Sequence, residues 1–271
     1  YVETLHGRGI SVWGLVSNIS ENPPDTHTVL SSTTNRRNLI SNIIGVAEKY
    51  SLDGINIDFE TLNVETGVHF IQFIRELSVE CRNNGLVLSV SDYTPYSYNA
   101  YRHTAEQSRI CDYVAIMAYD DYVGGNEAGP NAGLSFVSEV MSVCSTVVDM
   151  NRLIVGIPFY TRLWYEYQDG TLGRETCDMN TVEELKTAHE LSFQWLEDVG
   201  YDYAEYTDES KEYQDDGTEV TNSTRVRIWY ENANSLDAKL RLISQYNVAG
   251  IGSWRLGQET ADVWAVLEKY Y

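Results

Sequence analysis

The ten residues SLDGINIDFE, Ser51–Glu60, combine the apolar pattern of a buried strand with acidic side chains. Successive side chains of a β-strand point to opposite faces of its sheet. One face of this predicted strand carries Ile55, Ile57 and Phe59, and the other carries Asn56, Asp58 and Glu60. The pattern therefore predicts a strand that packs one face on a core and presents two carboxyl groups near its end.

Two carboxyl groups this close together predict a raised pKa for a carboxyl group at this position. Burial and a like-charged neighbour both disfavour the charged form of a carboxyl group and raise its pKa. A general acid that works near neutral pH needs such a raised pKa. Glu60 is the outermost acid and the better candidate for a proton donor, whereas Asp58 is suited to binding a substrate group or to holding Glu60. The alternative is that hydrogen bonds within the fold satisfy both acids.

Predicted strands and helices alternate along the rest of the chain. Apolar runs predict strands at 10–18, 51–60, 86–94, 111–121, 152–162 and 248–257, and helical spacing predicts helices at 34–51, 66–85, 99–110, 133–148, 235–247 and 260–271. Residues 1–9 have the pattern of a helix end closed by Gly9. This alternation predicts the α/β class with a parallel sheet, either a closed barrel or a doubly wound sheet.

Polar and aromatic side chains gather where the predicted strands end, and this favours the barrel. They are Asn18, Asp58, Glu60, Asp92, Tyr93, Tyr119, Asp120, Tyr160, Arg162, Trp254 and Arg255. In a TIM (β/α)8 barrel this edge is the catalytic face. Glycine motifs for nucleotide binding do not occur in the sequence. Because six strand signals are found and such a barrel has eight, we expect its first two βα units to be absent from this chain.

A long interval separates the strand that ends near Arg162 from the next predicted helix. It exceeds an ordinary loop, so we predict a small α+β insertion at 165–230. Residues 181–200 have a helical pattern, and Asp216-Gly217 is a hairpin-turn signal. Trp164 and Trp229 are suited either to stacking on sugars or to packing in a core.

Composition excludes several classes of protein. The 271 residues carry a net charge of −21, which opposes binding to the phosphates of nucleic acid. No apolar run is long enough to cross a membrane, and no signal-peptide pattern opens the chain. The four cysteines and five histidines have no metal-binding spacing, so we predict no metal site, and no cofactor motif is present.

At this point the sequence resembles a known family. Asp53, Gly54, Asn56, Asp58 and Glu60 match the pattern DG-x-[DN]-x-D-x-E of glycoside hydrolase family 18, the chitinase-type family. Three further segments are similar to later strands of that family: MAYDD with Met117, Tyr119 and Asp120, GIPFYTR ending at Arg162, and SWRLG with Trp254. The resemblance implies that residues 1–271 are a catalytic barrel and that Ser51–Glu60 is its fourth strand.

The resemblance also implies a substrate-assisted retaining mechanism, in which the substrate's own acetamido oxygen replaces a protein nucleophile. Glu60 would be the proton donor, Asp58 and Tyr119 would act on the acetamido group, and Trp254 would pack under the sugar. Asn56 departs from the Asp of many chitinases, and an amide cannot relay a proton from Asp58. Asn56, Met117, Asp120, Arg162 and Glu127 are further candidates for contacting substrate in the cleft, and the last three are equally suited to surface ion pairs.

The loop sequences are similar to those of the bacterial spore-cortex and cell-wall N-acetylglucosaminidase branch of this family. This implies a polysaccharide containing N-acetylglucosamine as partner, peptidoglycan or chitin, and an extracellular, cell-wall or spore-associated place. It also implies wall-binding modules outside this chain. A non-catalytic lectin on the same fold is the alternative, and the presence of Glu60, which family lectins commonly replace, favours the enzyme.

Overall fold

The structure, a computed structural model, describes residues 1–19, 25–123, 127–213 and 219–270. Two compact units make up the chain. Unit 1 comprises Tyr1–Met117, Ser142–Val155 and Asn247–Gly250, and unit 2 comprises Ala118–Met141, Gly156–Tyr246 and Ile251–Tyr271.

Unit 1 is an α/β unit built on parallel strands. Its elements are α1 (Val2–His6), β1 (Trp13–Ser17), α2 (Thr26–Ser31), α3 (Thr33–Tyr50), β2 (Gly54–Asp58), α4 (Val64–Asn83), β3 (Val87–Asp92), the 3-10 helix η1 (Ser97–Arg102), α5 (Thr104–Ile110), β4 (Tyr113–Met117) and the 3-10 helix η2 (Met150–Arg152). Strands β1 to β4 pair in chain order, all in parallel. The predicted α/β class with a parallel sheet is therefore confirmed.

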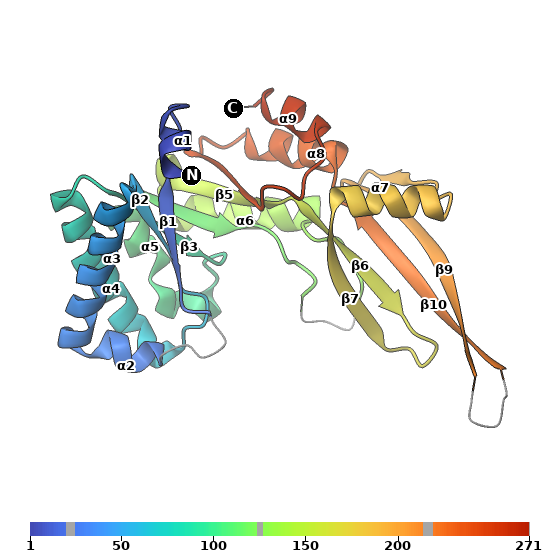
Figure 1. The fold of residues 1–271 in the computed structure, drawn as a ribbon, viewed down its shortest axis with the longest axis horizontal. Coiled ribbons are helices and arrows are strands. Elements are labelled where there is room, and N and C mark those ends of the chain that lie inside the picture. The colour runs from blue at the N-terminus through green and yellow to red at the C-terminus, as the bar shows by residue number, and fades with distance from the viewer. Residues whose placement is uncertain (20–24, 124–126, 214–218, 271) are drawn as a thin grey trace. The chain divides into compact units, whose positions relative to one another are not determined.

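The apolar face of β2 lies on the core of unit 1. Ile55, Ile57 and Phe59 are buried against apolar side chains of α3 and α4, and the Phe59 ring stacks on Phe73 with ring centres 5.7 Å apart. Figure 1 shows α3 and α4 lying side by side against these strands. Each helix begins at a polar cap, because the side chains of Ser32 and Asn63 accept hydrogen bonds from backbone N–H groups of the first turn.

Unit 2 is dominated by an antiparallel sheet. Its own elements are β6 (Tyr160–Glu166), β7 (Leu172–Asp178), α7 (Met179–Ala188), β8 (Gln194–Leu196), β9 (Tyr201–Tyr213), β10 (Glu219–Tyr230), α8 (Ala233–Ile243) and α9 (Asp262–Leu267). The strand order is β7-β6-β10-β9-β8. Helix α7 lies along this sheet (Figure 1). Three other elements have residues in both units: α6 (Leu134–Val147), β5 (Leu153–Pro158) and β11 (Gly250–Trp254). The parallel sheet has the strand order β1-β2-β3-β4-β5-β11.

Several predicted elements differ from the structure. The helix expected at 181–200 ends at Ala188, and three later residues, Gln194–Leu196, pair with β9 instead. The strand expected at 152–162 is two strands, β5 and β6, which belong to different sheets. The helix expected at 99–110 begins as the 3-10 helix η1 before α5. Strands β9 and β10 pair antiparallel, and the turn expected at Asp216-Gly217 lies outside the described residues.

Candidate functional site

Strand β2 delivers the two acids of the signature. Asp58 is its last residue and is 9% exposed, whereas Glu60 follows two residues later and is half-buried. Burial of Asp58, followed by the nearby charge of Glu60, raises the pKa of Asp58, and the positive charge of Arg102 partly opposes this. The raised pKa that we expected from two close carboxyl groups therefore belongs to Asp58.

The backbone around Glu60 is held from two sides. The Glu60 N–H donates to Asn18 Oδ1 at 3.0 Å, and Asn18 Nδ2 donates to the carbonyl oxygen of Thr61 at 3.1 Å. From the other side, Arg102 Nη2 donates to the carbonyl oxygen of Phe59 at 2.8 Å and Nη1 to that of Glu60 at 3.3 Å. These bonds fix the chain where it leaves the sheet and so fix the starting point of the Glu60 side chain.

The carboxyl group of Glu60 has a direct partner. Tyr93, which follows β3, donates its hydroxyl to Glu60 Oε2 at 2.7 Å. Burial, this hydrogen bond and the negative charge of Glu60 all raise the pKa of Tyr93, so its hydroxyl stays protonated and remains a donor.

Behind Tyr93 lies a buried ion pair. Arg102 Nε donates to Asp92 Oδ1, and both side chains are buried. The Asp92 carboxylate also accepts from Thr104 Oγ1 at 2.8 Å and from Gln107 Nε2 at 3.0 Å. It accepts a further bond from the backbone N–H of Tyr93 at 2.9 Å. Because these donors neutralise and solvate the charge, the pair is affordable in the interior, and it joins the ends of β2 and β3.

Asn56 points to β3 and not to its own neighbouring acids. Its Nδ2 donates to Ser89 Oγ at 2.8 Å, and its Oδ1 accepts from Ser91 Oγ at 3.0 Å. Ser89 is its register partner on β3. The amide therefore has a fixed orientation within the sheet, and its role in binding substrate stays a prediction.

Unit 2 brings together a second group of the predicted residues. Asp120 Oδ1 accepts from Arg162 Nη2 at 2.6 Å and from the Tyr160 hydroxyl at 2.5 Å. Asp120 has a φ of 65°, an uncommon conformation for a residue with a side chain, and Asn131 supports it by accepting the Asp120 N–H at 3.0 Å. Asn131 also donates to the Tyr160 carbonyl oxygen at 3.2 Å. Asp120 and Arg162 thus form an ion pair, the alternative that the sequence left open, and their role in lining the cleft stays a prediction.

The remaining predicted site residues are placed as follows. Tyr119 is half-buried in unit 2 and lies edge-on to the Tyr160 ring at 6.3 Å between ring centres. Met117 is half-buried at the end of β4. Glu127 is exposed. Trp254 ends β11, is 47% exposed, and precedes a cis peptide bond.

Trp164 and Trp229 belong to the core of unit 2, which decides between the two alternatives left by the sequence. Both are buried with Tyr201, and Trp164 Nε1 donates to the carbonyl oxygen of Gly129 at 2.8 Å.

The same unit buries a charged pair, in which Lys239 Nζ lies 2.8 Å from Glu231 Oε1 and the Tyr201 hydroxyl donates to Glu231 Oε2 at 2.5 Å.

Several residues of these clusters received no role from the sequence. Asn18, Asp92, Tyr93 and Tyr160 stand at strand ends in the sequence, and this was the signal that could have assigned them roles. Arg102 had no such signal, because it binds the backbone 42 to 43 residues away. Asn131 lies in the segment before α6, where no pattern marks it.

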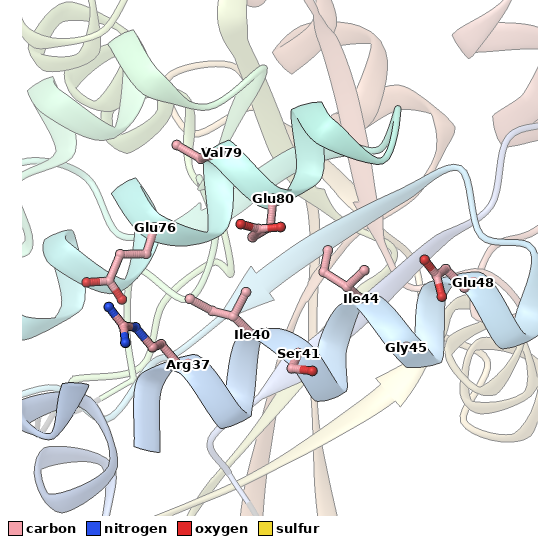
Figure 2. A pocket seen from close by; sticks show the side chains of 9 residues that line it. All are labelled: Arg37, Ile40, Ser41, Ile44, Gly45, Glu48, Glu76, Val79 and Glu80. Carbon is pink, nitrogen blue, oxygen red and sulfur yellow. The ribbon is translucent and has the colours of Figure 1, made fainter. Parts of the chain in front are cut away.

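A hollow elsewhere in unit 1 contains none of the predicted site residues. It has a volume of about 760 Å³ and lies between α3 and α4 (Figure 2). Ile40 and Ile44 of α3 point toward α4, and Glu80 of α4 points toward α3; the lining also includes Arg37, Glu48, Glu76 and Val79. Across the described part of the chain, no cluster of three or more His, Cys, Asp or Glu residues is arranged to hold a metal ion. Nor is any helix there long and apolar enough to cross a membrane.

Paired carboxyl groups at the end of a sheet strand are typical of glycoside hydrolases. A family model described as glycosyl hydrolases family 18 matches residues 21–259. The chain belongs to this family.

Comparison with individual proteins gives distant relatives and a shared fold. The chain is 24% identical over 269 residues to a protein named putative sporulation-specific glycosylase YdhD of Bacillus subtilis, covering 94% of this chain and 60% of that protein. It superimposes on the spore cortex-lytic enzyme SleL of Bacillus megaterium with a TM-score of 0.83 at 18% identity, covering 99% of this chain and 61% of the other. A chitinase of Chromobacterium violaceum gives a TM-score of 0.82 at 24% identity, with 99% and 82% covered. The chain therefore spans about 60% of the length of YdhD and SleL.

Proposed function

We propose that this chain is a glycosidase that cleaves linkages of N-acetylglucosamine in a polysaccharide, with Glu60 as proton donor. The observation that carries the proposal is the pair at the end of β2, where half-buried Glu60 is held by Tyr93 and buried Asp58 has a raised pKa. Membership of glycosyl hydrolases family 18 supports the reaction class.

The proposed reaction has two steps. Glu60 protonates the glycosidic oxygen while the substrate's acetamido oxygen attacks the anomeric carbon, so the glycosidic bond breaks and an oxazolinium ion forms. Asp58 accepts a hydrogen bond from the acetamido N–H and balances the positive charge. Glu60, now a carboxylate, takes a proton from a water molecule whose oxygen attacks the anomeric carbon. The bond from that carbon to the acetamido oxygen breaks, so the oxazolinium ring opens and the configuration is retained. The resemblance implies that Tyr119 hydrogen-bonds to the acetamido oxygen and that Trp254 packs against one face of the sugar.

The proposed mechanism also limits the class of substrate. Substrate assistance needs an N-acetyl group on the sugar at the cleavage point, which favours peptidoglycan of the spore cortex or cell wall, or chitin. The names of YdhD and SleL support peptidoglycan and a spore or cell-wall location, and the similarity to a chitinase supports chitin. We further propose that β1, β2, β3, β4, β5 and β11 are equivalent to strands three to eight of a TIM barrel, and that Met117, Asn56, Asp120, Arg162 and Glu127 contact substrate.

Replacement of the proposed acid tests the function. Glu60→Gln should lower the hydrolysis of N-acetylglucosamine oligomers or cortex fragments by about 10²–10⁴-fold, the usual contribution of a general acid, and leave binding intact. The exposed Glu65 on α4 gives a matched control, Glu65→Gln, which should hydrolyse like the wild type. Undiminished turnover by Glu60→Gln would exclude the mechanism. If the wild type binds these oligomers and hydrolyses none of them, the lectin alternative is correct.

A further inference from the structure

Tyr93, Glu60, Arg102 and Asp92 form a closed ring of contacts in unit 1. The Tyr93 hydroxyl binds the Glu60 side chain, and Arg102 binds the Glu60 carbonyl oxygen. Arg102 is paired with Asp92, and the Asp92 carboxylate accepts the backbone N–H of Tyr93. Every step of the ring is a hydrogen bond between two side chains or between a side chain and the backbone. The position of the Tyr93 hydroxyl is therefore fixed by the same groups that fix Glu60.

The hydroxyl of Tyr93 has no structural need for this bond. The Arg102 guanidinium lies 5.2 Å from the centre of the Tyr93 ring and holds it by a cation–π contact, and the backbone is held by Asp92. Tyr93 is also 39% exposed, so water is available to a hydroxyl that lacks a protein partner. A bond from this hydroxyl to Glu60 thus acts on the carboxyl group and adds little to folding.

Within the part of unit 1 that the structure describes, three charged or titratable side chains interact with Glu60. Asp58 comes from β2, Tyr93 from the segment after β3, and Arg102 from η1, and all three interact electrostatically across this small region. Asp58 places a second carboxyl group beside Glu60, whereas Tyr93 and Arg102 both donate hydrogen bonds to Glu60. Arg102 donates to the carbonyl oxygen of Glu60, and the Tyr93 hydroxyl donates to its carboxyl oxygen.

We propose that Tyr93 is a positioning residue of the acid–base site, which orients the Glu60 carboxyl group and sets how readily it gives up and regains a proton. The proposal rests on the proposed role of Glu60. In the first step Glu60 must be protonated, and in the second it must be a carboxylate. A donor hydrogen bond to one carboxylate oxygen stabilises the ionised form and leaves the other oxygen for the substrate and then for water.

Removal of one oxygen atom tests the proposal. In Tyr93→Phe the ring and its contact with Arg102 are retained while the donor is lost, so the ionised form of Glu60 is less stable. The pKa of Glu60 should rise by about 1–2 pH units, in keeping with the strength of a hydrogen bond to a charged group. It is measured by titrating carbon-13-labelled glutamate carboxyl groups, with the Glu60 signal assigned by its loss in Glu60→Gln. The high-pH limb of the kcat profile should move upward by the same amount.

Two further variants make the result decisive. Because the neighbouring carboxyl group of Asp58 could complicate the reading, the measurement is repeated with Tyr93→Phe in an Asp58→Asn background, which leaves Glu60 as the remaining acid of the pair. Tyr98→Phe removes the same hydroxyl from a residue that is 76% exposed on η1, and it should leave the Glu60 titration unchanged. If Tyr93→Phe leaves the Glu60 titration where it is in the wild type, the proposal is wrong. The titration needs no substrate, so a protein that hydrolyses nothing refutes the proposed function and still tests this inference.

Discussion

Arg162 Nη2 donates a hydrogen bond to Asp120 Oδ1 across 2.6 Å, although the arginine is buried and the aspartate is 40% exposed. The Tyr160 hydroxyl binds the same oxygen, and the negative charge of Asp120 helps burial to raise the pKa of Tyr160. The buried Nη1 of Arg162 has no hydrogen-bond partner in the described part of the chain. Two donors therefore orient the carboxylate of Asp120 at a partly exposed position.

Arg162→Lys tests whether this orientation matters for catalysis. Lysine keeps the charge, but its ammonium group does not reproduce the position of the Arg162 Nη2 donor, so kcat/KM should fall about tenfold while the melting temperature changes little. Steady-state kinetics on an N-acetylglucosamine oligomer measures the effect. Arg225→Lys is the matched control in the same antiparallel sheet, since Arg225 is 47% exposed and pairs with Glu205 and Glu166. Equal kinetics for the two variants would show that the Asp120 pair only supports the fold.

Asp58→Asn should stabilise the protein while it abolishes activity. The folded state raises the pKa of Asp58, so the stability that this group contributes is complete below its unfolded pKa and is lost as the pH rises through the folded pKa. At pH 7 the ionised group therefore costs stability, and an amide should remove about 0.5–2 kcal/mol of that cost. The gain in melting temperature should disappear below about pH 4.

Asp53→Asn provides the control with the opposite sign. Hydrogen bonds from the Val12 N–H and then from His6 lower the pKa of Asp53, so its contribution is present above its unfolded pKa and lost as the pH falls. This variant should therefore melt below the wild type at pH 7 and match it in acid. A gain for Asp58→Asn that persists at pH 3 would contradict the assignment of the raised pKa.

The buried pair behind Glu60 should be expensive to break. Arg102→Met leaves the Asp92 carboxylate charged and buried, so the free energy of unfolding should fall by about 3–5 kcal/mol. Arg75→Met removes an arginine of the same unit that is 46% exposed and pairs with Glu106, and it should cost about 0–1 kcal/mol. Urea denaturation measures both. A similar cost for the two arginines would mean that the Asp92 site takes up water or a proton when its partner is lost.

Two helix glycines of unit 1 should respond oppositely to the same substitution. A Cβ at Gly67 on α4 would lie 2.1 Å from the carbonyl oxygen of Tyr101, whereas one at Gly45 on α3 meets nothing within 4 Å. Gly45→Ala should stabilise the protein by about 0.5–1 kcal/mol, because glycine is a poor helix former. Gly67→Ala should destabilise it by about 1–3 kcal/mol and also slow hydrolysis, because Tyr101 precedes Arg102 on η1. Denaturation and kinetics on the same samples test both, and unchanged kinetics in Gly67→Ala would separate η1 from the site.

Most helices and strands of unit 1 could be predicted from the sequence, because the patterns that indicate them are local. Alternation along β2 and helical spacing in α3 and α4 each act over a few residues, and the structure agrees with them. Helix α2 was missed because six residues are too few to show a period. Strand β8 was mistaken for the end of a helix, since three residues become a strand only by pairing with β9.

The candidate site divides in the same way. Asp58, Glu60 and Asp120 could be predicted, because each is a polar residue at the end of an apolar strand pattern. The contacts that orient them come from elsewhere: Arg102 lies on a 3-10 helix, and Asn131 reaches Asp120 from the segment before α6. Such contacts depend on how distant segments pack, and no short pattern records them.

The hydrogen bonds from Ser89 and Ser91 to Asn56 have one more consequence. The polar face of β2 has room for three titrating groups in a row, but its innermost member is an amide, and both of its polar atoms are already occupied by β3. Any proton taken up or released at this row must therefore enter and leave at the Glu60 end. Deuterium exchange at the two carboxyl groups would then pass through the solvent or the bound sugar, and the interior of the sheet would take no part in it.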